Sequence, residues 1–132
     1  MKPSNFQFTN PYLLNLDYQI NKDFAPNKNT SEIEVNFSTN CNIIKNEGSK
    51  EAIVELSISI GQKDNSVPFY ISATEVAKFK WNDEVDNEIL EILLNQNAPS
   101  LLLSYLRPLI STITSAGPVG SYNIPFMDFT KK

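Results

Sequence analysis

The fold is decided by residues 52–81, "AIVELSISIGQKDNSVPFYISATEVAKFKW". From residue 54 to residue 60 every second side chain is aliphatic, and the side chains between them are Glu or Ser. This alternation predicts a strand with one buried face. The polar residues 61–66 predict a turn.

A second alternating stretch follows that turn at once. Residues 69–81 place aromatic and aliphatic side chains on one parity, with Glu75 as an interruption. A bend or bulge is therefore expected near Glu75. Two long strands joined by a short turn are antiparallel, which predicts the centre of a β-meander.

The residues before this pair predict two more strands. In "SEIEVNFST", residues 31–39, the side chains of Ile33, Val35 and Phe37 share one face, and residues 45–51 form a turn. In "SNFQFTN", residues 4–10, two Phe residues alternate with polar neighbours, and Pro11 is expected to end the strand. Residues 12–20 fit either a helical turn or an irregular apolar loop, and the Asn-rich residues after them predict a loop.

Helical periodicity begins after residue 82. We expect a short helix capped by Asp83, with a buried stripe formed by Val85, Ile89, Ile92 and Leu93. A longer helix is expected from Pro99 to Ser115, kinked at Pro108 and ended by Gly117-Pro118. The remaining residues predict an extended apolar tail.

These elements predict a single α+β domain over residues 1–132. It consists of a four-stranded antiparallel sheet on which one long helix and one short helix pack. Since one helical layer covers only one face of a sheet, a second copy of the chain is expected to contribute cover.

Composition narrows the function. The net charge of −4 and pI near 4.8 argue against a nucleic-acid-binding protein. The chain has no histidine, one cysteine and no Gly-rich phosphate loop, so we expect no enzyme, no metal and no cofactor. The acidic residues 83–91 fit the start of a helix better than a metal site. No signal peptide or apolar run of membrane length is found, and the protein is expected to be cytoplasmic.

Several short motifs, taken in order, resemble the SecB family of protein-export chaperones. They are Phe8-Thr9-Asn10-Pro11, Lys22-Asp23-Phe24-Ala25-Pro26, Tyr105-Leu106-Arg107, Ser115-Ala116-Gly117, Asn123-Ile124 and Met127-Asp128-Phe129. The second is similar to the family's crossover loop, with Phe in the position of its Trp. Each motif is weak alone, but together they span nearly the whole chain.

The resemblance implies a protomer that pairs into a dimer, with two dimers packed through their long helices into a homotetramer. It also implies binding of unfolded polypeptides, including preproteins for export, in apolar grooves and their transfer to the ATPase SecA. Two departures weaken the SecA prediction. The sequence ends at Lys131-Lys132 without the family's acidic or Gly-rich tail, and the final lid helix is missing.

The resemblance and the apolar tail together suggest site residues. The predicted client-binding residues are Phe24, Tyr122, Ile124, Phe126 and Phe129. The predicted oligomer-interface residues are Leu102, Leu106, Leu109, Ile113, Tyr105 and Arg107. Two alternatives remain open: Phe24 folds back on its own core, or the tail is a plain extended segment that packs on the edge of the sheet. A chaperone dedicated to a toxin–antitoxin system and a non-catalytic structural or assembly protein also remain possible functions.

Overall fold

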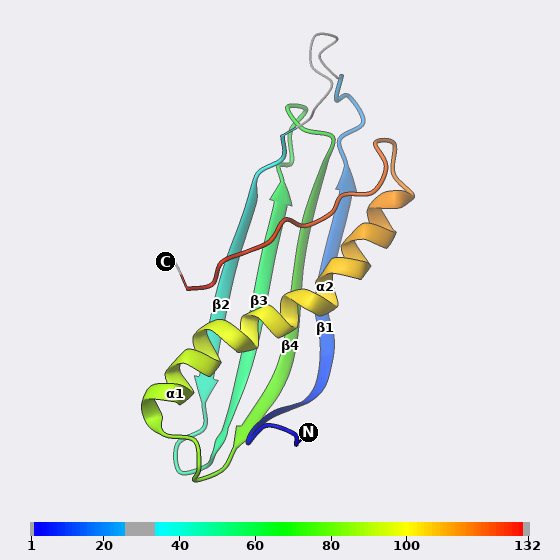
Figure 1. Cartoon of the computed structure of the whole chain (residues 1–132). Coiled ribbons are helices and arrows are strands. Elements are labelled where there is room, and N and C mark those ends of the chain that lie inside the picture. Colours follow the sequence, from blue (N-terminus) through cyan, green and yellow to red (C-terminus); the bar gives the residue numbers. More distant parts are fainter. Residues whose placement is uncertain (1, 26–33, 131–132) are drawn as a thin grey trace.

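The computed structural model describes residues 2–25 and 34–130 as one sheet with a helical layer on one face (Figure 1). The sheet is antiparallel with strand order β1-β4-β3-β2. Its strands are β1 (Phe6–Ile20), β2 (Phe37–Lys45), β3 (Glu51–Gly61) and β4 (Phe69–Trp81). A continuous helical run follows, formed by α1 (Asn87–Ile92), a π-helical turn (Leu93–Asn97) and α2 (Ala98–Ser115). The predicted fold class is confirmed.

The core lies between α2 and the two central strands. The alternating aliphatic side chains of β3, from Val54 to Ile60, are at most 2% exposed, and Phe69, Ile71 and Phe79 of β4 join them on the same face. Burial of these inward-facing side chains removes enough apolar surface from water to hold the helical layer on the sheet.

Strand β1 differs from the prediction, because Pro11 does not end it. The strand continues to Ile20 and includes residues 12–20, for which a helical turn or loop was expected. Pro11 is tolerated because β1 is an edge strand, and because the pairing with β4 shifts between Thr9 and Tyr12. Asn10 beside it adopts φ 49°, a left-handed conformation that Asn tolerates well.

The bulge expected near Glu75 lies in the neighbouring strand. The register of β1 against β4 shifts between Leu13 and Asn15, directly opposite Glu75. The pairing of β4 with β3 continues through Glu75 without interruption. Glu75 itself points to the helix-bearing face, as its partner Leu56 does, and is 4% exposed.

Strand β2 begins later than predicted. It runs from Phe37 to Lys45, whereas residues 34–36 are described without strand structure and Ile33 lies outside the described residues. The segment Asn40–Ile44 has weak alternation, but each of its residues is paired with β3. Pairing with a strongly patterned neighbour therefore extends a strand that its own sequence indicates poorly.

The short helix buries a different face from the one predicted. Asp86, and not Asp83, is its N-cap, because the Asp86 carboxylate accepts a hydrogen bond from the Ile89 N–H at 2.9 Å. The predicted stripe residues Ile89 and Ile92 are about half exposed. The buried positions recur every fourth residue instead: Leu90, Leu94, Ala98, Leu102, Leu106, Ile110 and Thr114.

A spacing of four residues rotates a stripe by about 40° per step around an α-helix. The wider π-helical turn takes up part of that drift, so that α1 and α2 face the same sheet. The predicted long helix is confirmed, and it continues through Pro108, which is exposed on the side away from the core.

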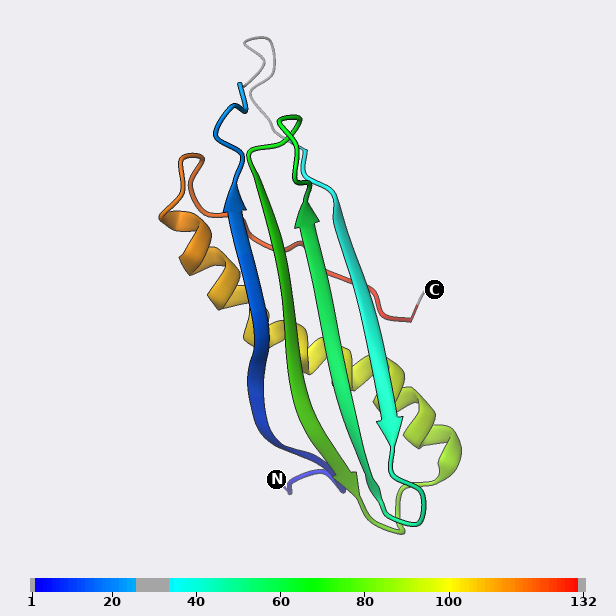
Figure 2. The same cartoon turned by 180° about the vertical axis from the view of Figure 1, so that it is seen from behind.

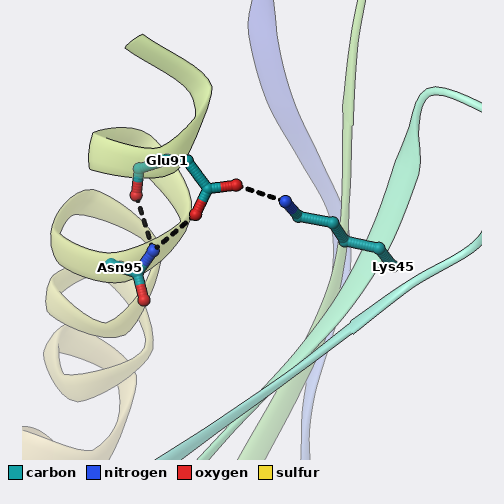
Figure 3. A network of polar contacts seen from close by, with 3 residues as sticks. All are labelled: Lys45, Glu91 and Asn95. Atoms are coloured by element: carbon teal, nitrogen blue, oxygen red, sulfur yellow. Dashed lines mark hydrogen bonds and ion pairs between the residues drawn. The ribbon is translucent and has the colours of Figure 1, made fainter. Parts of the chain in front are cut away.

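A polar contact fixes the start of the helical layer to the edge of the sheet (Figure 3). The Lys45 ammonium at the end of β2 pairs with the Glu91 carboxylate on α1, and the Asn95 amide donates to the Glu91 carbonyl at 2.7 Å. The hydrogen bond from Lys45 holds the pKa of Glu91 below its usual value. Because both side chains are exposed, the pair is expected to orient α1 more than to stabilise the fold.

In the described part of the chain, no helix lies on the second face of the sheet (Figure 2). Across its centre lie the small polar side chains Ser38, Asn40, Asn42, Ser57, Ser59, Ser72 and Thr74. Exposed apolar residues are confined to one end, where Tyr12, Ile44 and Ile53 lie. Most of this face is therefore polar, and cover by a second copy of the chain stays a prediction.

Candidate functional site

Residues 118–130, here called the C-terminal segment, lie on the helix-bearing face of the sheet. The segment leaves the end of α2 beside β1 and runs back across the strands toward β2, without helix or strand structure of its own (Figure 1). Gly117 in the turn into the segment lies close to β1, because a Cβ at that position would come too close to the Tyr18 hydroxyl oxygen and would require the Tyr18 side chain to shift.

Two side chains of α2 hold the C-terminal segment by its backbone. The Thr114 hydroxyl accepts a hydrogen bond from the Tyr122 N–H at 2.8 Å. The Arg107 guanidinium donates to the Ile124 carbonyl and, at 2.8 Å, to the Pro125 carbonyl. Thr114 is 1% exposed and donates its own proton to the Ile110 carbonyl, which aims the hydroxyl lone pairs at the segment.

Side chains of the C-terminal segment reach the core at alternate positions. The Tyr122 ring packs edge-on against Phe69, with ring centroids 5.8 Å apart, and Ile124 is 5% exposed within the core cluster. The alternation then skips one residue, and Met127 and Phe129 are half-buried against the same core. Burial also raises the pKa of the Tyr122 hydroxyl.

Phe126 lies at the skipped position and is fully exposed. The Arg107 guanidinium lies over its ring, 5.7 Å from the centroid. Arg107 therefore contacts both the backbone of the segment and its most exposed apolar side chain. Hollows open at both ends of the segment, one beside Phe69 and Val119 and the other beside Gln96 and Phe129.

The structure places the five predicted client-binding residues in three kinds of environment. Phe126 is exposed, Tyr122 and Phe129 are half-buried, and Ile124 is buried in the protomer's own core. Phe24 is half-buried in the turn after β1, where its N–H donates to the Asn21 carbonyl at 3.1 Å. Within residues 2–25 and 34–130, no hydrogen bond or ring contact joins Phe24 to the C-terminal segment. Pro26 of the predicted crossover loop lies outside the described residues.

The six predicted interface residues are also divided. Leu102 and Leu106 lie on the side of α2 that faces the sheet and are 0% exposed. They pack in the protomer's own core and offer no side-chain surface to a partner. Leu109 and Ile113 are half-buried, and Tyr105 is 42% exposed. Arg107 is half-buried and donates to carbonyl groups of the C-terminal segment.

Thr114 and Phe69 are the contributors to this site that sequence reasoning missed. Thr114 continues the four-residue spacing of buried positions along α2, and a buried Thr at the end of such a series signals a polar anchor. In the described part of the chain, no group of His, Cys, Asp and Glu side chains is arranged to hold a metal ion, and no helix is long and apolar enough to cross a membrane.

The family model of SecB, preprotein translocase subunit SecB, matches residues 3–131. The fold is similar to that of the Mycobacterium tuberculosis Rv1957 SecB-like chaperone, solved in complex with a ChAD peptide from the Rv1956 HigA1 antitoxin. The TM-score is 0.73 at 13% identity, over 92% of this chain and 90% of that chain. A protein of unknown function from Streptococcus agalactiae is similar with a TM-score of 0.53 at 15% identity, over 92% of this chain and 97% of that chain. No curated protein sequence matches.

Proposed function

Because this chain belongs to the SecB family, a family of chaperones, we propose that it is a holdase that binds unfolded polypeptides. The observation that carries the proposal is the family match over residues 3–131, nearly the whole chain. Preproteins for export are the clients that this family membership favours.

The proposed client surface is formed by the exposed and half-buried aromatic side chains of the C-terminal segment together with Phe24. Phe126 offers its whole ring, and Tyr122 and Phe129 offer their outer edges. Ile124 is buried in the present arrangement and contributes only if the segment moves. Exposed apolar side chains of this kind favour an interaction surface.

The proposed mechanism involves no bond chemistry. Apolar side chains of an extended client are captured by burial of surface area, at roughly 1.5–3 kcal/mol for each aromatic that becomes fully covered. Backbone hydrogen bonds add affinity without selecting a sequence. Neither a cofactor nor a metal takes part in this mechanism.

Assembly as a dimer of dimers remains part of the proposal. Exposed apolar side chains on β1 (Leu13, Leu14) and on α2 (Tyr105) support it. Several client sites in one assembly would bind different parts of one long chain and raise its affinity. Light scattering at micromolar concentration tests this directly, and a monodisperse monomer contradicts it. Cytoplasmic location and transfer of clients to SecA also belong to the proposal.

A second candidate function is a chaperone dedicated to one antitoxin. It is favoured by the structural similarity to Rv1957, which was solved with a peptide from an antitoxin. The two functions differ in selectivity. A general holdase binds unrelated unfolded proteins with similar affinity, whereas a dedicated chaperone binds one unstable partner far more tightly than all others.

The test is suppression of aggregation of an unrelated unfolded protein, together with the affinity for a permanently unfolded one such as reduced, carboxymethylated α-lactalbumin. Replacing Phe24 and Phe126 together by Ala is expected to weaken binding at least tenfold. The matched control replaces Ile89 and Ile92, two half-exposed residues of α1, by Ala. A parent protein that neither binds the unfolded probe nor suppresses aggregation would contradict the proposed function.

A further inference from the structure

We propose that the C-terminal segment is an internal stand-in for a client, and that an extended apolar segment of an unfolded polypeptide displaces it from its seat. The seat is the strip of the helix-bearing face that the segment covers, lined by Phe69 of β4 and by Arg107 and Thr114 of α2. This inference rests on the proposed function and adds where the client lies and how it is held.

The hydrogen bonds between α2 and the C-terminal segment do not involve the segment's side chains. The hydrogen bonds that α2 makes to the segment all go to backbone atoms, namely the Tyr122 N–H and the carbonyls of Ile124 and Pro125. Any peptide can supply an N–H and two carbonyls at these places. The polar part of the seat is therefore independent of sequence.

The spacing of the anchors fits an extended chain. Arg107 and Thr114 are seven residues apart, which is about 10.5 Å along a helix. From residue 122 to residue 125 an extended chain advances about 10 Å. Because α2 is one continuous helix through both residues, it presents an acceptor and a donor at about the separation that an extended peptide requires.

The apolar contacts of the C-terminal segment with the core have a simple spacing. Ile124 is buried in the core and Tyr122, two residues before it, is half-buried against Phe69, whereas Asn123 between them is exposed. Segments that form β-strands in a folded protein commonly carry apolar side chains at alternate positions, and these segments are exposed when the protein is unfolded. The seat is therefore expected to bind a peptide with apolar residues at positions i and i+2. The carbonyl groups of residues i+2 and i+3 would accept the hydrogen bonds from Arg107.

The attachment of the C-terminal segment is also weak enough to be exchanged. Among the described residues, no backbone–backbone hydrogen bond joins residues 118–130 to the sheet, and only Ile124 is fully buried. Phe126 stands exposed beside the Arg107 anchor. A client that first binds Phe126 is therefore next to the contact that it must replace.

Hydrogen exchange of the full-length protein tests the displacement. The Tyr122 amide is protected by Thr114, so its exchange is expected to accelerate at least tenfold when reduced, carboxymethylated α-lactalbumin is bound. Amides in the middle of α2, such as that of Leu106, are expected to keep their protection. If the unfolded probe binds but the Tyr122 amide stays equally protected, the stand-in proposal is wrong while the proposed function stands. Absence of any binding contradicts the proposed function itself.

A full-length variant gives the second readout. Ile124→Ser loosens the segment, and because the segment competes with the client, affinity for the unfolded probe is expected to rise about fivefold. Asn123→Ser alters the exposed neighbour and is expected to leave affinity unchanged. An Ile124→Ser protein that binds the probe more weakly than the parent would show that Ile124 is part of the client surface and not a competitor. If this variant does not fold, the exchange experiment on the parent protein still decides.

Discussion

Helix α2 and the C-terminal segment cover the same face of the sheet, but they are attached in different ways. The helix inserts a side chain at every fourth position, from Ala98 to Thr114, and almost all of its hold on the sheet comes from buried apolar area. The segment inserts one fully buried side chain and depends on three backbone hydrogen bonds from α2. The helix also satisfies its own backbone, whereas the segment needs a partner for its backbone groups.

This difference separates a fixed layer from an exchangeable one. Removing α2 would expose the whole core, so no ligand of ordinary affinity could offset the loss. Removing the segment exposes chiefly the surface around Phe69 and leaves Arg107 and Thr114 to be satisfied by water or by another peptide. Substitutions in the two layers should therefore differ in stability and in client binding.

The largest effect is expected for Leu106→Ala. Leu106 is 0% exposed at the centre of the α2 stripe, and truncating a buried Leu costs about 2–5 kcal/mol of unfolding free energy. Urea unfolding followed by circular dichroism measures this loss. The control is Tyr105→Ala on the exposed side of the same turn, for which a change below about 1 kcal/mol is expected. Equal losses for the two variants would show that α2 is not fixed by its buried stripe.

The elements that the sequence predicted well are those whose own pattern decides them. Strand β3 alternates strictly from Val54 to Ile60, β4 alternates apart from Glu75, and α2 combines a proline in its first turn with a glycine after its end. Those predicted poorly depend on their neighbours. Pro11 is compatible with a strand only because β1 lies at an edge, and β2 extends to Lys45 through its pairing with β3.

The candidate site was predicted in part, for a similar reason. The apolar residues of the C-terminal segment were visible in the sequence, but their individual burial was not. Whether Ile124 or Phe126 faces inward depends on which carbonyl groups of the segment accept hydrogen bonds from Arg107. A contact between residues 17 or 18 positions apart in the chain leaves no local sequence pattern. Thr114 continues a four-residue series along α2 that can be read from the sequence, whereas its neighbour Ile113, predicted at the oligomer interface, is half-buried.

A smaller effect is expected at Glu75, the acidic side chain that β4 places on the helix-bearing face. Burial raises its pKa above the usual value for Glu. A carboxyl group whose pKa is raised on folding stabilises the protein while it is protonated, and this contribution is lost as the pH rises through the raised pKa. Glu75→Gln should therefore be more stable than the parent at pH 7, because an amide carries no charge to desolvate, and a gain of about 1 kcal/mol is expected. The difference should vanish near pH 4.

The measurement for Glu75 is the urea midpoint of both proteins between pH 4 and pH 8. Glu47→Gln in the exposed turn between β2 and β3 is the matched control, and it should follow the parent at every pH. A Glu75→Gln variant that is less stable than the parent at pH 7 would show that the carboxylate has a favourable partner, as an oligomer interface on this face would provide.

The smallest effect on stability is expected for Phe126→Ala, and it separates the two layers most sharply. Phe126 is fully exposed, so its removal takes no apolar area out of the core. What is lost is the contact with the Arg107 guanidinium at 5.7 Å, worth about 0.5–1 kcal/mol at an exposed site. The urea midpoint should therefore stay close to that of the parent, while affinity for an unfolded protein falls severalfold because an aromatic contact is missing. Ile124→Ser should do the reverse, lowering the midpoint and raising the affinity. If Phe126→Ala instead destabilises the protein as strongly as Leu106→Ala does, the segment is a fixed part of the core, and the distinction between the two layers is lost.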